Sequence, residues 1–181
     1  AFINYGNWAK STEHALFASV PRIAIAYQIP LIWWGENPAL QVGELGMKRD
    51  LPYDGNSIKY NNTLAGGNIN WLLDAGIEIN QLIQYKYPTD YDMNLANLRI
   101  ICMDYFIKDF NPYSNGIFSS LRGLCVKEPN PKVDPDYFGV SMLDEDFINI
   151  NMYMRYLKFG FGSASDIVNF EIRSNRLTRD E

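Results

Sequence analysis

The sequence predicts an α/β fold with a parallel sheet and a largely helical carboxy-terminal region. Apolar residues recur at helical spacing over residues 12–27. The uncharged stretch "IPLIWW", residues 29–34, follows directly and is apolar on both faces, as in a strand buried within a parallel sheet. Near the other end, residues 142–159 carry one amphipathic stripe. A helix, a short turn and a buried strand together form half of a βαβ unit.

The composition favours one sizeable core and argues against a membrane protein and against a nucleic-acid binder. The chain has 181 residues, 47% hydrophobic and 20% charged, with a formal net charge of -5. Its longest candidate for a membrane span, residues 16–34, contains Arg22, Gln28 and two prolines, and no run reaches the ~18 uncharged apolar residues that a span needs. No basic patch typical of a nucleic-acid binder is present. We therefore expect no membrane and no nucleic-acid partner.

Cysteine and histidine usage restricts the chemistry. The chain has two cysteines, Cys102 and Cys125, which form neither a disulfide framework nor a CxxC motif. His14 is the single histidine, so a multi-histidine metal site within the chain is excluded. We expect both cysteines to be ordinary buried thiols in a reducing compartment, hence a cytoplasmic protein.

The remaining elements of the first part follow from spacing and turn chemistry. Pro21 is expected either to kink the 12–27 helix or to begin a second one. Residues 35–67 are rich in Gly, Asn, Asp and Pro and are expected to form an extended loop. A second helix is predicted over 69–84, and "LRIICM", residues 98–103, is a second strand candidate.

The last part is predicted to be mostly helical after an irregular stretch at 109–140. The amphipathic stripe that follows has a capping-box-like start at Ser141 and Asp144, and Gly160 supplies its stop. Helical spacing resumes over 164–175. Thr178 and the final glutamate read as a capping box at the opening of a further helix, and the first residue is not methionine. We therefore expect this chain to be a segment of a longer protein.

Glu36 and Asn37 stand at the end of the 29–34 strand, directly after Gly35. In open α/β sheets, ligands bind beyond the carboxyl ends of the strands. The carboxylate in such a turn can bind Mg²⁺, a ribose hydroxyl or a protonated amine. The alternative is that Glu36 and Asn37 only cap a turn before Pro38, and the sequence leaves both interpretations open.

The stretch "LKFGFGSASD", residues 157–166, is the second candidate site. Gly160 and Gly162 allow the backbone to approach a ligand closely, with Lys158 and Asp166 at the rims. The alternative is a helix-to-helix turn with glycine at the C-cap and a serine capping the next helix.

Two further patterns each have two interpretations. Arg173, Arg176 and Arg179 recur every three residues and can clamp phosphate or form a solvated, salt-bridged surface. Aromatic residues make up 14% of the chain and can stack on sugar rings or fill the core.

Three blocks carry a resemblance to a known family. They are "YGNWAKSTEHALFASVPRIAIAYQIPLIWWGENPALQVGELG", "YDGNSIKYNNTLAGGNINWLL" and "INMYMRYLKFGFGSASDIVNFEIRSNRLTRDE". In this order they resemble the N-acetyl sugar amidotransferase family of O-antigen, lipopolysaccharide, pseudaminic acid and legionaminic acid biosynthesis. Family members are considerably longer, and their front half carries an S-G-G-x-D-S pyrophosphate loop that is not among these residues.

The resemblance implies a fold like the PP-loop ATP pyrophosphatases, which have the Rossmann-like parallel sheet of adenine-nucleotide alpha hydrolases. Residues 1–110 would be the carboxy-terminal part of that ATPase-like domain, and 111–181 a mostly helical extension of the same enzyme. The segment would lack the nucleotide loop, and we expect it to be inactive alone.

The implied reaction converts a sugar acetamido group into an acetamidino group. The amide oxygen attacks the α-phosphorus of ATP and releases pyrophosphate; ammonia then adds to the imidate carbon, and AMP leaves. ATP and Mg²⁺ are the implied cofactors, the N-acetyl sugar is the substrate, and a separate glutaminase subunit supplies ammonia. A non-catalytic sugar- or partner-binding module is the alternative.

The resemblance also implies roles for individual residues. Glu36 and Asn37 would be catalytic, with Glu36 holding the metal or deprotonating ammonium. Nucleotide or substrate binding would involve Trp34, Gly35, Lys158, Gly160, Gly162, Asp166 and Arg173. The enzyme interpretation expects the turn at Gly35 and the turn at Gly160 to meet in one cleft.

Overall fold

The structure is a computed structural model that describes residues 1–35, 55–61, 63–107, 111–128, 136, 139–140, 143–144 and 146–180. The chain divides into two compact units. One unit comprises residues 9–108, and the other comprises residues 1–8 together with 109–181. Each unit is described by itself.

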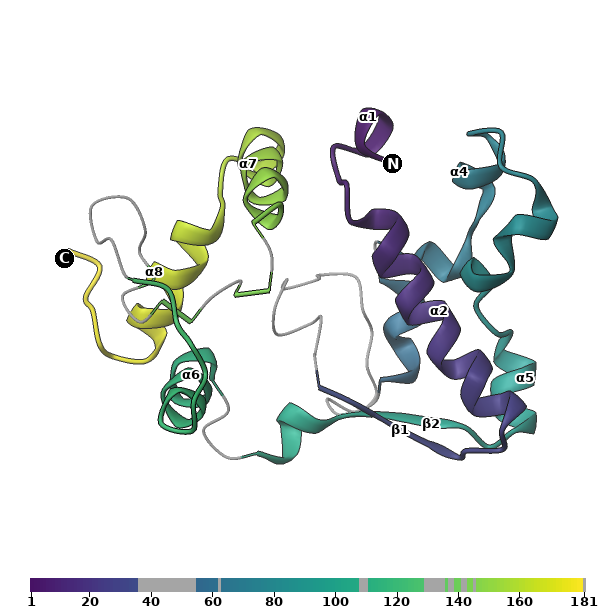
Figure 1. Ribbon diagram of the computed structural model, residues 1–181, viewed down its shortest axis with the longest axis horizontal. Helices are drawn as coiled ribbons and strands as arrows, with labels where there is room; N and C mark the ends of the chain where they lie inside the picture. Colours follow the sequence, from purple (N-terminus) through teal and green to yellow (C-terminus); the bar gives the residue numbers. More distant parts are fainter. Residues whose placement is uncertain are drawn as a thin grey trace. The chain divides into compact units, whose positions relative to one another are not determined.

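Unit 9–108 contains the sheet (Figure 1). Among the described residues, it also contains most of the buried apolar side chains. Its α-helices and strands are α2 (Lys10–Ala26), β1 (Leu31–Trp34), α4 (Asn70–Leu73), α5 (Asp90–Leu95) and β2 (Arg99–Cys102). Its 3-10 helices are η1 (Asn56–Tyr60), η2 (Ala65–Gly67), η3 (Ile79–Tyr85) and η4 (Met103–Phe106).

The second unit is helical in its described part. Its helices are α1 (Phe2–Tyr5), α6 (Pro112–Ser120), α7 (Ile148–Phe159) and α8 (Ser163–Arg173). Among the residues that the structure describes, no helix is long and apolar enough to cross a membrane.

Helix α2 matches the predicted 12–27 helix closely. Pro21 lies inside the helix and does not end it, so neither a break nor a second helix begins there. The buried face of α2 includes Phe17, Ala18 and Ala24, which recur at the spacing of one helical face. Those side chains pack on the sheet and on the segments that connect its two strands.

Strands β1 and β2 are parallel, with Leu31 opposite Arg99 and Trp34 opposite Cys102. The predicted α/β class and the predicted parallel pairing are therefore confirmed. The expectation of a strand buried on both faces is wrong, since Trp33 is 57% exposed whereas Ile32 is 8% exposed. Only one face of the pair packs on α2, and Leu31 and Trp33 lie on the other face.

Asn56 occupies the edge of β2 that faces away from β1. The N–H of Ile100 donates to Asn56 Oδ1 at 2.7 Å, and Asn56 Nδ2 donates to the carbonyl of Leu98 at 3.3 Å. The N–H of Gly55 donates to the carbonyl of Ile100 at 2.8 Å. A Cβ at Gly55 would lie 2.6 Å from Ile100 Cγ2, so this close approach requires glycine.

The expectation that both cysteines are buried is wrong for Cys125, which is exposed, and is confirmed for Cys102. Three predicted elements also differ from the structure. The helix predicted over 69–84 is divided into α4 and η3, and Gly76, with a φ of 83°, lies in the turn between them. Within the region expected to be irregular, Asn111 caps α6 by accepting from the N–H of Ser114, and Pro112 occupies its first turn. Helix α7 begins at Ile148 rather than at 142, and Ser141 of the predicted cap lies outside the described residues.

Candidate functional site

The carboxyl ends of β1 and β2 form the edge at which the sequence predicts a ligand. Because the strands are parallel with Trp34 opposite Cys102, the segments that follow these two residues leave the sheet at the same edge. Trp34 packs on Phe17, with ring centroids 5.1 Å apart, so its ring belongs partly to the core. Gly35 is exposed, and a Cβ there would meet no atom within 4 Å. Glu36 and Asn37 lie outside the described residues.

Asp104 is a carboxylate at this edge that the sequence analysis missed. It lies in η4 directly after β2 and is only 6% exposed. Cys102 and Trp34 lie opposite each other in the sheet. Asp104 follows Cys102 at the same spacing at which Glu36 follows Trp34. The signal that indicates Glu36, an acid just after a strand, is also present in "LRIICMD".

An exposed aromatic cluster lies on the uncovered face of the sheet. The ring centroids of Trp33 and Phe106 are 6.4 Å apart, and Tyr105 contacts Phe106 edge-on at 5.3 Å. All three side chains are more than half exposed. Such rings offer flat apolar faces to a sugar ring or to a protein side chain.

Glycine at the end of α7 acts as a helix C-cap. Gly160 has a φ of 77°, a left-handed conformation that favours glycine, and its N–H donates to the carbonyl of Tyr156 at 2.7 Å. Gly162 is the N-cap of α8, so Ser163 does not cap that helix as the turn interpretation expected. The glycine spacing of "KFGFG" is thus accounted for by a helix-to-helix turn.

Two of the predicted ligand-binding side chains have protein partners. Asp166 accepts two hydrogen bonds from the guanidinium of Arg155, at 2.5 and 3.2 Å, which joins α8 to α7. The ammonium of Lys158 donates to the carbonyls of Tyr5 and Gly6 at 3.1 and 3.3 Å. These contacts satisfy the end of α1 and fix the α7–α8 turn, and a role for either side chain in ligand binding stays a prediction.

The arginine stripe is in part a salt-bridged surface. Arg176 donates to both carboxylate oxygens of Glu171, at 2.6 and 3.0 Å, and its guanidinium lies 5.3 Å from the centre of the Tyr113 ring. The hydrogen bonds from Arg176 lower the pKa of Glu171, and burial raises the pKa of Tyr113 to about 12. Arg173 is exposed in the last turn of α8.

A buried lysine near the sheet is a second feature that the sequence did not predict. Lys59 is 9% exposed and its ammonium donates to Asp90 Oδ1 at 2.8 Å, while the Tyr60 hydroxyl donates to Asp90 Oδ2 at 2.7 Å. These hydrogen bonds, from Lys59 first and Tyr60 second, lower the pKa of Asp90. The ammonium also lies over the Tyr60 and Tyr87 rings. The cation is therefore fully engaged within the protein.

The predicted residues fall into different units. Trp34 and Gly35 belong to unit 9–108, whereas the turn at Gly160 belongs to the other unit. The cleft that the sequence predicts between these two turns stays a prediction. Within the described ranges, no three His, Cys, Asp or Glu side chains are grouped so that they could hold a metal ion.

Comparison of the chain with protein-family models and with curated proteins found no match. The resemblance described above therefore rests on the quoted blocks of sequence alone.

Proposed function

We propose that the chain is part of an ATP-dependent N-acetyl sugar amidotransferase, which converts a sugar acetamido group into an acetamidino group. The structural observation that supports this proposal is the parallel register of β1 and β2. It brings Gly35, the first residue of the family-like block "GENPAL", to the same sheet edge as Asp104. Enzymes with open α/β sheets bind their ligands at this edge.

The donor groups at this edge fit the chemistry that the proposal needs. Mg²⁺ prefers carboxylate oxygens, and Asp104 supplies one such group next to the carboxyl end of β1. Glu36 would supply a second, by its place in the sequence. Bound Mg²⁺ would neutralise the charge of the departing pyrophosphate.

The chain's own residues would have three tasks. Glu36 would hold the metal or take a proton from the arriving ammonium, and Asn37 would hydrogen-bond the substrate. Trp34 and Gly35 would line the nucleotide side of the site, where the absence of a side chain at Gly35 leaves room for a ligand. Arg173 would meet a phosphate or a sugar carboxylate.

The test uses the natural full-length protein together with its glutaminase. The proposal expects release of AMP and pyrophosphate that depends on both an acetamido sugar and a source of ammonia, with one amidine formed per AMP. Ammonium chloride should replace glutamine and the glutaminase. ATP consumption that yields ADP, or that is independent of the sugar, would reject the proposal.

The exposed cluster of Trp33, Tyr105 and Phe106 favours a second candidate, a non-catalytic sugar- or partner-binding module. This alternative expects saturable sugar binding with no nucleotide turnover. Trp33→Ala should then abolish binding, whereas the enzyme proposal expects residual AMP release from the same variant.

A further inference from the structure

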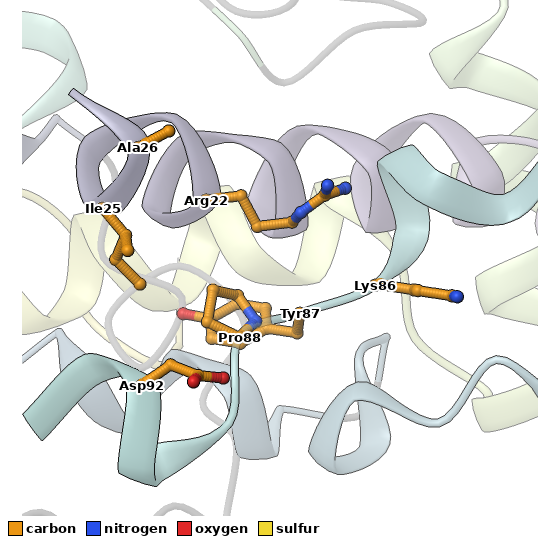
Figure 2. Close-up of a pocket in the computed structure, with 7 residues that line it drawn as sticks. All are labelled: Arg22, Ile25, Ala26, Lys86, Tyr87, Pro88 and Asp92. Atoms are coloured by element: carbon orange, nitrogen blue, oxygen red, sulfur yellow. The ribbon is translucent and has the colours of Figure 1, made fainter. Parts of the chain in front are cut away.

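A cavity of about 340 Å³ lies between α2 and the chain that enters α5. It is lined by Arg22, Ile25 and Ala26 of α2 and by Lys86, Tyr87, Pro88 and Asp92 (Figure 2). All of these residues belong to unit 9–108. This volume falls in the range of small-molecule sites, about 300–1,000 Å³. The cavity is separate from the carboxyl edge of the sheet, because Ile25 and Ala26 precede β1 whereas Gly35 follows it.

The polar groups of the cavity are divided between its ends. In Figure 2, the guanidinium of Arg22 and the ammonium of Lys86 lie toward one end, and the Tyr87 hydroxyl and the Asp92 carboxylate lie toward the other. Ile25, Ala26 and Pro88 supply the apolar part of the lining. The cavity thus has a cationic end, an apolar wall and a hydrogen-bonding end.

The cationic end has donors to offer a ligand. Arg22 donates to the carbonyl of Ile83, and this hydrogen bond holds the guanidinium in place. The other N–H groups of the guanidinium can donate to a ligand. Lys86 is exposed and forms no ion pair with any residue that the structure describes. Lys59, in contrast, is paired with Asp90 close by. Two cations that flank one cavity match an oxyanion.

Tyr87 supplies the second, independent observation. This residue is 9% exposed, and its hydroxyl is buried without a hydrogen-bond partner in the described part of the chain. A buried hydroxyl with no partner is unfavourable, and an acceptor on a ligand would remove that cost. Beside it, Asp92 uses Oδ2 to accept from the N–H and hydroxyl of Thr89. Its Oδ1 remains for a ligand donor.

We propose that this cavity binds a small organic oxyanion that carries a hydroxyl group at its other end. The oxyanion, a phosphate or a carboxylate, meets Arg22 and Lys86. The ligand's hydroxyl accepts from Tyr87 and donates to Asp92. The negative charge of Asp92 keeps the oxyanion at the cationic end, so the ligand binds in one orientation.

The test titrates the full chain with glycerol 3-phosphate, followed by calorimetry and by the amide NMR shifts of residues 86–92. We expect saturable binding with a dissociation constant of about 1 mM or lower. Propyl phosphate, which lacks the hydroxyls, should bind about tenfold more weakly, because it loses the hydrogen bond from Tyr87 and the charge-assisted hydrogen bond to Asp92. Glycerate distinguishes a carboxylate ligand from a phosphate ligand, because the tighter binder identifies the natural oxyanion.

Variants locate the site. Lys86→Gln changes an exposed side chain and should weaken binding about tenfold, whereas Arg122→Gln, an exposed cation of the other unit, should leave it unchanged. Tyr87→Phe should reduce the preference for glycerol 3-phosphate over propyl phosphate without removing it, because the hydrogen bond to Asp92 remains. Absence of saturable binding, unchanged affinity in Lys86→Gln, or amide shifts confined to residues outside 22–26 and 86–92 would each overturn the proposal.

Discussion

Arg155 on α7 and Asp166 on α8 are joined by two hydrogen bonds across the "KFGFG" turn, at 2.5 and 3.2 Å. The guanidinium also lies 4.6 Å from the centre of the Phe161 ring inside that turn. Asp166, which the sequence offered as a ligand-binding residue, therefore contributes to holding two helices together. This contact between the guanidinium and the ring gives Phe161 a structural role between the two glycines.

The first prediction concerns this pair. Arg155→Ala and Asp166→Ala should each destabilise the α7–α8 packing, and a double-mutant cycle should give a coupling of about 0.5–1 kcal/mol, because the Asp166 side chain is 43% exposed. Urea denaturation followed by circular dichroism measures it. A coupling of zero would mean that the contact does not stabilise the unit and would return Asp166 to the candidate ligands.

The second prediction concerns Asn56 at the edge of β2. Asn56→Ala removes the acceptor for the N–H of Ile100 and the donor to Leu98, and should cost about 1–3 kcal/mol because a buried backbone group loses its partner. Asn94→Ala, an exposed site on α5, is the matched control and should change stability little. Hydrogen exchange of the Ile100 amide should accelerate only in the first variant; unchanged protection would contradict this role.

The third prediction compares Glu36 with Asp104. If both carboxylates serve Mg²⁺ in the proposed enzyme, Glu36→Gln and Asp104→Asn should each lower the rate of AMP release in the full-length protein by about 100-fold or more. Excess Mg²⁺ should recover part of the loss in both. Asp74→Asn, on the turn after α4, is the control. Normal turnover in Glu36→Gln would reject its assignment, whatever the effect at Asp104.

The outcome for individual elements shows what the sequence can and cannot predict. Helix α2 was predicted almost to its ends because its apolar face repeats over several turns, and the two strands were found as short apolar runs between turn residues. Exposure of Trp33 was not predicted, since an apolar run carries no information on which face is covered. The pairs Arg155–Asp166 and Lys59–Asp90 join positions far enough apart that only the folded chain brings them together.

Asp104 and the cavity beside Tyr87 were also not predicted from the sequence, for different reasons. Asp104 could have been predicted, because it is an acid just after a strand. The parallel register with β1 shows that it lies at the same sheet edge as the end of β1. The cavity has no such signal, because Arg22 and Lys86 come from segments that approach one another only when α2 packs against the chain before α5. Long-range packing of this kind leaves no spacing pattern in the sequence.

The last prediction concerns His14, which is fully buried on α2 between the rings of Trp71 and Tyr85. Burial lowers its pKa from the ordinary value of 6.5, the positive charge of Lys10 lowers it further, and the backbone of Tyr85 acts in the opposite direction. The unfolded chain therefore binds a proton at a pH where the folded chain does not. The resulting stability is fully present above about pH 6.5 and is lost as the pH falls below that value.

Urea denaturation followed by tryptophan fluorescence should show this loss between pH 6.5 and pH 5. His14→Phe keeps an aromatic ring in the same apolar surroundings and removes the titrating group, so its stability should be flat over that interval. The carboxylates of Asp90, Asp92 and Glu171, whose pKa values are lowered by hydrogen bonds, contribute a separate loss at more acidic pH in both proteins. An identical pH dependence above pH 5 in the two proteins would show that His14 does not titrate on unfolding.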